Sequence, residues 1–321
     1  MSIAPYIKEI GRGAAGARSL TQAQAEDLLG AVFDGRVSDL EIGAFVLAMR
    51  MKGETLDELA GFLSALQARC LRIDSDRPVV VIPSYNGARR LPNLTPLLAM
   101  ALAQQGARVL VHGQPRDPAR VTTVSIFHDL GLQPAHNSDD VHSLWARREP
   151  AFVHTETLCA PLQRLLDVRW VVGVRNAGHT VAKMLNPVAG ARCLRLVSYT
   201  HPEFGALMSS WAQRDRVDAM LLRGTEGEAV ADPRRQPRID TWTSGELRPA
   251  WCVPAQDGVI AELPLLPREH DAATTALYIQ SVLSGEKPAP APLLRQVELV
   301  LSVLEGIDGR SAARTAREKT A

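Results

Sequence analysis

Apolar and polar positions recur with helical spacing through the first 73 residues. Each helix start carries a capping box, in which a Ser or Thr is followed three residues later by Glu or Gln. The three boxes are Thr21 with Gln24, Ser38 with Glu41, and Thr55 with Glu58. Gly35 and Gly53 stand where two of these helices should end. Since such short helices cannot each close a core, we expect a small helical domain over residues 1–73, whose apolar faces can also serve a dimer.

The pattern changes after residue 74 to strands that alternate with helices. The β-branched run at 79–82 predicts a buried strand, and a helix is expected over 93–105. Further strands are expected at 107–111, 152–154, 193–198 and 219–222, with helices at 117–131, 161–166, 179–185 and after His201-Pro202. Alternation of this kind predicts a parallel sheet with crossover helices. The fold class is therefore α/β, with a larger domain over residues 74–321 and a central, mostly parallel sheet.

The last third of the chain is less regular. Residues 232–268 are rich in Pro, Arg and Trp, and we expect irregular structure or short antiparallel strands there. Helices are predicted at 272–284, 291–305 and 311–319, separated from one another by short breaks. No internal repeat is visible, and residues 285–292 are the nearest approach to a linker.

The turn after the strand at 79–82 is the first candidate for a site. Pro83, Asn86 and Gly87 are turn residues, and a helix follows them. In α/β proteins, ligands bind at the carboxyl ends of the strands. The stretch from Val79 to Arg90 is thus predicted to hold a ligand loop.

Composition excludes several classes of protein. The chain has 321 residues, is 46% hydrophobic and carries a net charge of +1, so its total charge gives no argument for nucleic acid or membrane. No apolar run approaches the roughly 20 residues of a membrane helix. Residues 1–9 contain no apolar signal-peptide core, so we expect a cytoplasmic protein. The scattered cysteines Cys70, Cys159, Cys193 and Cys252 are expected to be reduced, mostly packed thiols without a metal.

Several segments resemble the anthranilate phosphoribosyltransferases. They are residues 35–39, 42–45 and 48–55, followed by His112-Gly113, Gly173-Val174-Arg175-Asn176 and Leu185-Asn186-Pro187. The resemblance covers residues 3 to about 305. It implies the nucleoside phosphorylase/phosphoribosyltransferase fold, in which an insertion near residues 160–188 completes the helical domain. It also implies a homodimer through that domain.

The catalytic motifs of that family are altered in this sequence. The family's phosphate loop reads Gly-Thr-Gly-Gly-Asp, and its glycines let bare backbone N–H groups approach a pyrophosphate. Here Pro83 removes an N–H and Tyr85 adds a ring. The family's lysine becomes Val111, and its magnesium-binding Asp-Glu pair becomes the segment 225–228. The positions that match the substrate site are Ser84, Tyr85, Asn86, Gly87, Asn93, Thr95, His112, Gly113 and Arg175, the last matching the arginine that receives the anthranilate carboxylate.

A closer resemblance is to the YbiB-type proteins. It rests on the segment from Ile7 to Gly13 and on the segment from Ile82 to Arg89. This resemblance implies a homodimer that binds DNA and RNA without sequence preference and does not catalyse phosphoribosyl transfer. It implies no catalytic residue and no cofactor.

Charge is segregated along the chain in a way that fits this implication. Residues 21–58 are mainly acidic, whereas residues 86–120 and 164–195 are mainly basic, and arginine strongly outnumbers lysine. Arginine suits bidentate contact with phosphate. The candidates for nucleic-acid contact are Arg89, Arg90, Arg116, Arg120, Lys183, Arg192, Arg310, Arg314 and Arg317.

Each of these features also has a structural explanation. A run of charge is usually a solvated surface, and the last three arginines can complement a helix dipole. Tyr85 can stack on a base or cover the edge of the core. Trp170 and Trp211 are predicted to lie in the core, and His112 to be packed rather than catalytic. Glu226 and Glu228 are expected to be turn residues rather than metal ligands.

Two hypotheses therefore remain open. The first is a sequence-independent nucleic-acid-binding homodimer on a degenerate scaffold. The alternative is an active phosphoribosyltransferase that uses phosphoribosyl pyrophosphate and Mg²⁺ with a rebuilt loop. Free N–H groups around a phosphate-sized pocket at residues 84–88 favour the enzyme, and a filled loop favours binding of nucleic acid.

Overall fold

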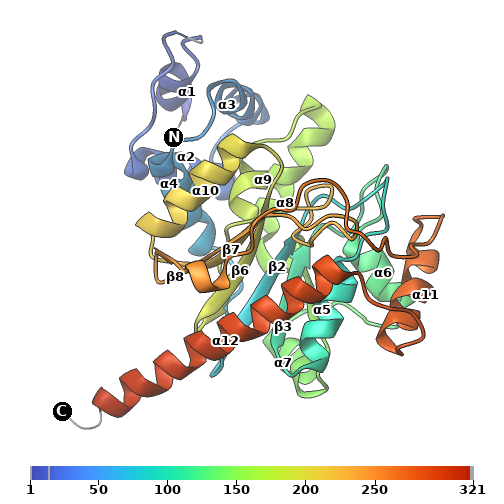
Figure 1. The fold of residues 1–321 in the computed structure, drawn as a ribbon. Coiled ribbons are helices and arrows are strands. Elements are labelled where there is room, and N and C mark those ends of the chain that lie inside the picture. The colour runs from blue at the N-terminus through green and yellow to red at the C-terminus, as the bar shows by residue number, and fades with distance from the viewer. Residues whose placement is uncertain (1, 14, 319–321) are drawn as a thin grey trace. The chain divides into compact units, whose positions relative to one another are not determined.

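The chain folds into two compact units. The structure is a computed structural model that describes the backbone of residues 2–13 and 15–318, and the side chains of residues 2–13 and 15–309. The helical unit comprises Met1–Leu71 and Thr155–Pro187, and the α/β unit comprises Arg72–His154 and Val188–Ala321 (Figure 1). The α/β fold class with a small N-terminal helical domain is confirmed.

Six helices make up the described part of the helical unit. They are α1 (Ala4–Ile10), α2 (Gln22–Phe33), α3 (Asp39–Lys52), α4 (Leu56–Gln67), α8 (Thr155–Val172) and α9 (Ala177–Ala182). All three predicted capping boxes form, at the starts of α2, α3 and α4. Phe45 of α3 and Phe62 of α4 pack edge to face in the core, with ring centroids 5.9 Å apart.

Seven strands form the main sheet of the α/β unit. In spatial order they are β4 (Ala151–His154), β3 (Arg108–Gly113), β2 (Val79–Ser84), β6 (Cys193–Tyr199), β7 (Asp218–Arg223), β8 (Ile239–Thr243) and β9 (Glu246–Leu247). The first five are parallel, and β8 and β9 are antiparallel, as the composition of residues 232–268 predicts. A separate parallel pair joins β1 (Ile73–Asp74) to β5 (Val188–Ala189).

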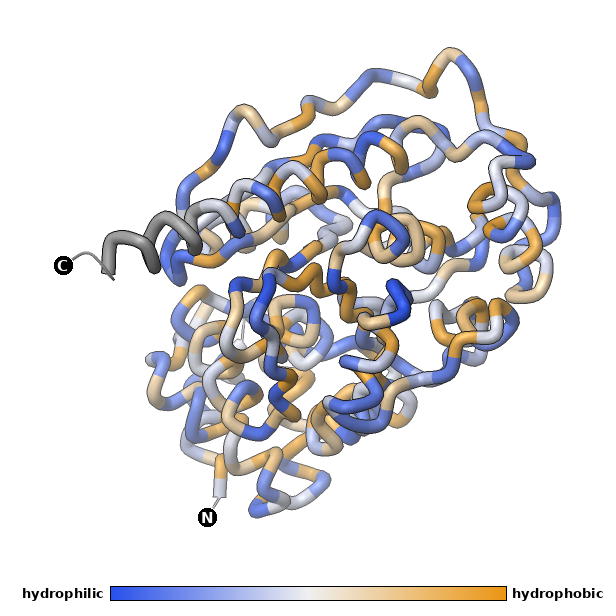
Figure 2. The backbone as a smooth tube through the Cα atoms, turned by 90° about the horizontal axis from the view of Figure 1, so that it is seen from below, coloured by the Kyte–Doolittle hydropathy of each residue, from blue (hydrophilic) through white to orange (hydrophobic). Residues whose placement is uncertain are grey.

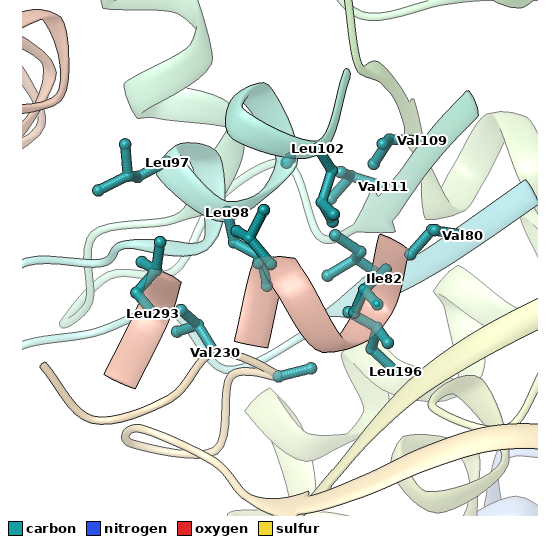
Figure 3. Close-up of a cluster of buried hydrophobic side chains, with 14 of the residues drawn as sticks. Val80, Ile82, Leu97, Leu98, Leu102, Val109, Val111, Leu196, Val230 and Leu293 are labelled. Atoms are coloured by element: carbon teal, nitrogen blue, oxygen red, sulfur yellow. The ribbon is translucent and has the colours of Figure 1, made fainter. Parts of the chain in front are cut away.

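Helices cover the sheet of the α/β unit. They are α5 (Thr95–Gln104), α6 (Thr123–Asp129), α7 (Ser138–Ala146), α10 (Pro202–Arg214), α11 (Ala272–Leu283) and α12 (Ala291–Glu318), with a short 3-10 helix η1 (Pro249–Trp251). Helix α12 packs beside α5 (Figure 1). Figure 3 shows Val80 and Ile82 of β2 facing Leu98 and Leu102 of α5 in one apolar cluster. Every residue of β2 is buried, because both faces of a central parallel strand are covered.

The hydropathy of α12 explains how this helix packs. Its buried residues include Leu293, Val297 and Val300, which recur at helical spacing, and Arg295 and Glu298 between them are exposed. Orange and blue positions accordingly alternate along the turns of this helix in Figure 2. No helix among the described residues is long and apolar enough to cross a membrane.

Two predicted helices differ from the structure, one helix was not predicted, and one residue expected in the core is exposed. The helix expected from residue 117 begins only at Thr123, capped by Thr122, because residues 117–120 form a turn. Helix α7 was not predicted, and the helices expected at 291–305 and 311–319 are one continuous helix as far as Glu318. Trp170 is 48% exposed rather than buried, whereas Trp211 lies in the core as predicted.

Candidate functional site

The loop that follows β2 lies where the connectivity of the sheet reverses. From β2 the chain crosses to β3 and then β4 on one side, whereas β6 and β7 add on the other side. Ligands of open α/β sheets bind at such a switch point, outside the carboxyl ends of the strands. The loop over residues 85–94 is therefore in the position that the sequence predicts for a ligand loop. The segment that follows β7, residues 224–231, reaches the same loop through the contacts below.

The carboxylate of Glu228 binds the first part of this loop. Its Oε1 atom accepts hydrogen bonds from the backbone N–H of Asn86 at 2.8 Å and of Gly87 at 2.7 Å. Its Oε2 atom lies 3.4 Å from the hydroxyl of Thr95 at the start of α5. Glu228 is 1% exposed, so these donors take the place of water around a buried charge.

The carboxylate of Glu226 binds the second part of the loop. It accepts hydrogen bonds from the backbone N–H of Arg90 at 2.7 Å, of Leu91 at 3.0 Å and of Arg89 at 3.2 Å. The guanidinium of Arg120 lies 3.7 Å from the same carboxylate and donates to the carbonyl of Gly87 at 3.2 Å. Arg120 thus holds the loop and its carboxylate together from one side.

All six backbone N–H groups from Asn86 to Leu91 have an acceptor within the α/β unit. Two bind Glu228, three bind Glu226, and that of Ala88 binds the carbonyl of Val121 at 3.0 Å. Convergent N–H groups of this kind form an anion-binding nest. The chain's own carboxylates occupy this nest, so a phosphate would have to displace them. Of the two outcomes stated for the loop, the structure has the filled one.

Two glycines allow this close approach of the loop and the residues after β7. Gly87 has a φ of +62°, and a Cβ atom there would lie 2.8 Å from the carbonyl oxygen of Val121. Gly227 has a φ of +92°, and a Cβ atom there would lie 2.3 Å from the amide of Asn86. That amide donates to the carbonyl of Gly227, which also accepts from the hydroxyl of Ser198 at 2.6 Å. Only glycine fits these positions without strain.

Tyr85 points into the protein rather than toward solvent. Its ring is 3% exposed, and its hydroxyl shares a hydrogen bond of 2.8 Å with Nδ1 of His112 at the end of β3. Burial without a charged partner lowers the pKa of His112 to about 3, so the imidazole is neutral near pH 7. Tyr85 therefore covers the edge of the core and cannot stack on a base in this conformation.

The remaining loop positions bind one another. Ser84, which pairs with Gly113 across β2 and β3, donates its hydroxyl to Thr123 at 2.8 Å. Asn93 donates its amide to the same hydroxyl at 3.0 Å and accepts from the backbone N–H of Thr95 at 3.1 Å. These side chains fix the route of the loop into α5.

Three of the predicted nucleic-acid contacts are exposed near this loop. The side chains of Arg89 and Arg90 project from the loop itself, and Arg116 lies on the segment that leads to Arg120. The backbone N–H groups of Arg89 and Arg90 themselves donate to Glu226. The same bonds that close the loop therefore place two guanidinium groups in solvent.

Arg192, another predicted nucleic-acid contact, lies away from this loop. Arg192 comes directly before β6 and makes a bidentate ion pair with Asp218, the first residue of β7. Both residues lie at the amino ends of their strands, at the opposite edge of the sheet from the loop. Its guanidinium balances a carboxylate that is 8% exposed, so it is not available to phosphate there.

The other predicted residues lie elsewhere. Arg175 and Lys183 belong to the helical unit, at the start and end of the α9 segment. Arg310, Arg314 and Arg317 fall within the length of α12, but their side chains lie outside the described residues.

Sequence reasoning missed a cavity at the carboxyl ends of β6 and β7. It has a volume of about 730 Å³ and is lined by Tyr199, Arg223 and Arg235, together with the ion pair of Arg238 and Asp240. Arg223 and Arg235 are exposed. The signal available in the sequence was that Tyr199 and Arg223 each end a strand, at the edge where ligands bind.

The carboxylates after β7 do not fit a magnesium site. Glu226 and Glu228 belong to the segment 225–228, where the resemblance puts the magnesium-binding pair, but both accept hydrogen bonds from backbone N–H groups. The positive ends of these N–H dipoles repel a cation, and Mg²⁺ requires oxygen ligands around it. Among the described residues there is no group of three or more His, Cys, Asp or Glu that could hold a metal ion.

Comparison with known proteins places this arrangement in context. Residues 4–70 match the helical bundle domain of a glycosyl transferase family. The uncharacterized protein YbiB of Escherichia coli K12 is 38% identical over 304 residues, which cover 94% of each chain. The anthranilate phosphoribosyltransferase of Beijerinckia indica is 24% identical over 299 residues, which cover 89% of this chain and 82% of the relative.

A solved structure has the same fold. Anthranilate phosphoribosyltransferase from Saccharomyces cerevisiae, in complex with PRPP and Mg, superimposes with a TM-score of 0.69 and 14% sequence identity. The match covers 95% of this chain and 89% of the yeast chain. The mostly parallel sheet and the helical domain are therefore those of the anthranilate phosphoribosyltransferase fold.

Proposed function

This chain belongs to the family of the Escherichia coli protein YbiB and has the anthranilate phosphoribosyltransferase-like fold, and from this premise we propose that it binds nucleic acid without sequence preference. In this proposal it does not transfer a phosphoribosyl group. The observation that carries the proposal is the occupation of the loop's N–H groups by Glu226 and Glu228.

The closed loop supports the loss of transfer for a physical reason. Enzymes that displace groups at phosphorylated centres depend on positioning and on preorganised positive charge. Here two carboxylates already accept from the loop's N–H groups, and their like charge opposes the entry of a pyrophosphate. Pro83 contributes no N–H to the loop, and Val111 contributes no cation.

The exposed arginines support binding of a phosphate polymer. Arg89, Arg90 and Arg116 extend from one loop system, and Arg223 and Arg235 line the cavity beyond β7. All of them lie at the carboxyl ends of the strands or on the loops that follow. Phosphates of DNA or RNA bind such groups with release of counterions, which requires no base contact. Lys183, Arg310, Arg314 and Arg317 extend this proposal to other parts of the chain.

A homodimer through the helical unit is part of the proposal. Three large apolar side chains of α3 are exposed in the single chain: Leu40 at 83%, Leu47 at 46% and Met51 at 86%. They are spaced by seven and four residues and so share one face of the helix. A second copy of this chain would remove that face from water.

The second candidate function is phosphoribosyl transfer. What favours it is that the backbone N–H groups still converge on an anion, so the nest itself has been retained. A transferase would require Glu226 and Glu228 to leave the loop and bind Mg²⁺ instead. The yeast relative was solved with PRPP and Mg, which makes this alternative worth testing.

The proposal is tested by the fluorescence anisotropy of labelled DNA and RNA oligonucleotides of unrelated sequence. We expect similar affinities for all sequences, with a loss of about 10³-fold or more between 50 and 200 mM salt if six or more phosphates are contacted. The double variant Arg89→Ala/Arg90→Ala should bind more weakly, with a salt slope smaller by about two.

A matched control is available at the other edge of the sheet. Arg147 and Arg148 are also adjacent and exposed, and they precede the amino end of β4. The variant Arg147→Ala/Arg148→Ala should bind like the wild type. Absence of binding by the wild type at low salt would contradict the proposal. If both double variants lowered the affinity equally, the loop would not be part of the binding surface.

A further inference from the structure

Two cysteines of the helical unit lie side by side, although they are far apart in the sequence. Cys70 follows the end of α4, and Cys159 stands at a break within α8, where its φ of −163° and ψ of 94° are not helical. The backbone N–H of Leu71 donates to the carbonyl of Leu158 at 2.8 Å. This bond joins the residues next to the two cysteines and holds their backbones together.

The two thiols are in direct contact. The side chain of Cys70 hydrogen-bonds to the sulfur of Cys159, and this bond lowers the pKa of the Cys159 thiol although burial opposes it. The guanidinium groups of Arg69 and Arg164 act in the same direction. Both arginines are fixed in place, Arg69 by Asp34 at 2.7 Å and Arg164 by the carbonyl of Phe33 at 3.3 Å. Cationic surroundings of this kind favour the thiolate, which is the reactive form.

Access to solvent differs between the two thiols. Cys70 is partly exposed, whereas Cys159 is 2% exposed. A small oxidant therefore reaches Cys70 first, and Cys159 is the thiol that can react with the product. An exposed thiol beside a second thiol is the usual arrangement of redox-sensitive cysteines.

We propose that Cys70 and Cys159 are an oxidation site at which a peroxide produces an intramolecular disulfide. The Cys159 thiolate takes the proton of the Cys70 thiol, and the Cys70 sulfur attacks hydrogen peroxide, which forms a sulfur–oxygen bond and breaks the O–O bond. The hydroxide released takes that proton from Cys159 and leaves as one water, so Cys159 is again a thiolate. The Cys159 thiolate then attacks the sulfenic acid sulfur, which forms the S–S bond and releases a second water. The two thiols lose two electrons and two protons in total, and one peroxide is reduced to two waters.

The disulfide would join the two chain segments that build the helical unit. Cys70 lies at the end of the first segment, Met1–Leu71, and Cys159 near the start of the second, Thr155–Pro187. A cross-link here closes the long loop that carries β1 to β4. Closing a long loop restricts the unfolded chain, so oxidation should raise the thermal stability of the protein.

The other two cysteines provide internal controls. Burial raises the pKa of Cys193 to about 12, so its thiol stays protonated near pH 7. Burial also raises the pKa of Cys252, whose sulfur donates to the carbonyl of Arg248 at 3.2 Å. Neither should react with peroxide under conditions that oxidise the pair.

The test uses the reduced full chain treated with hydrogen peroxide, alkylated and digested with trypsin without reductant. Mass spectrometry should find residues 70–72 linked to residues 149–164, and peptides containing Cys193 and Cys252 alkylated. Melting temperature should rise on oxidation of the wild type and of Cys252→Ser, but not of Cys70→Ser or Cys159→Ser. The proposal is overturned if Cys70 and Cys159 stay alkylatable, oxidise separately to sulfinic acids, or link to another cysteine.

Discussion

Glu228 illustrates how single residues close the loop after β2. Its carboxylate is buried and accepts hydrogen bonds from two buried backbone N–H groups, those of Asn86 and Gly87. A buried N–H without an acceptor destabilises a protein by about 1–3 kcal/mol. A neutral acceptor in place of the carboxylate still accepts the hydrogen bond, but the bond is weaker. The residue therefore stabilises the fold as well as occupying the nest.

Replacement of Glu228 should measure this contribution. We expect Glu228→Ala to lower the free energy of unfolding by about 2–4 kcal/mol, because two donors lose their acceptor. Glu228→Gln keeps an oxygen and should cost about 1 kcal/mol. Urea denaturation gives both values, and Glu246→Ala, whose side chain is 65% exposed, should change stability by less than about 0.5 kcal/mol. Equal midpoints for all three variants would contradict the role of Glu228.

His112 makes stability depend on pH. Its pKa is about 3 in the folded protein, below the ordinary 6.5, so between these values the unfolded chain binds a proton that the folded chain does not. The stability is complete above pH 6.5 and falls as the pH drops toward 3, by about 1.4 kcal/mol per pH unit. The pKa of His179 is lowered to about 3 by burial and then by Arg175, so it adds a similar slope.

The variant His112→Asn should therefore reduce this slope without removing it. Denaturation midpoints measured from pH 7 down to pH 4 give the slope for each protein. His128→Asn, which changes an imidazole with a 71% exposed side chain, should leave it as in the wild type. A slope that is unchanged in His112→Asn would mean that this imidazole is protonated in the folded state.

At the scale of elements, sequence motifs whose hydrogen bonds are local predicted helix starts correctly. A helix-start motif without such bonds, and a tryptophan placed only by its helical spacing, were predicted wrongly. The capping boxes of α2, α3 and α4 form as predicted because their bonds join residues only three positions apart. The Asp117-Pro118 pair also looks like a helix start, but the segment it opens pairs with the loop through Val121 and Ala88. Trp170 has helical spacing with core residues, yet its ring stacks on Arg169 and stays half exposed.

Helix α3 carries the prediction about assembly. Introducing charge into its exposed apolar face should prevent a second copy from packing there, because a buried unpaired charge is strongly destabilising. We expect Leu47→Glu/Met51→Glu to sediment as a monomer and the wild type as a dimer in analytical ultracentrifugation. Leu265→Glu changes a residue of the α/β unit that is 81% exposed, and it should remain a dimer. A monomeric wild type would refute the homodimer.

At the scale of the molecule, topology explains why the site was only partly predictable. The alternation of strands and helices predicts a parallel sheet, and the carboxyl end of β2 was correctly identified as the place of the loop. The sequence also indicates that its glycines are missing. It does not reveal that Glu226 and Glu228, some 140 positions away, supply the acceptors, because that contact depends on β7 lying beside β6.

The same reasoning explains the fate of the basic residues. Arg89 and Arg192 both belong to basic stretches of the sequence, but the parallel sheet places them at opposite edges. Charge patterning records which residues are positive, whereas strand direction decides which of them face the same ligand. Arg192 forms an ion pair with Asp218, whereas the side chain of Arg89 is exposed to solvent.

The most direct test asks whether the protein's own carboxylates close the phosphate loop. Phosphoribosyl pyrophosphate with Mg²⁺ is titrated into the wild type and into Glu226→Ala, and binding is measured by calorimetry. We predict no saturable binding by the wild type. Glu226→Ala should bind, because it frees the three N–H groups from Arg89 to Leu91 for an anion. Saturable binding by the wild type would contradict the account and favour a working phosphoribosyltransferase.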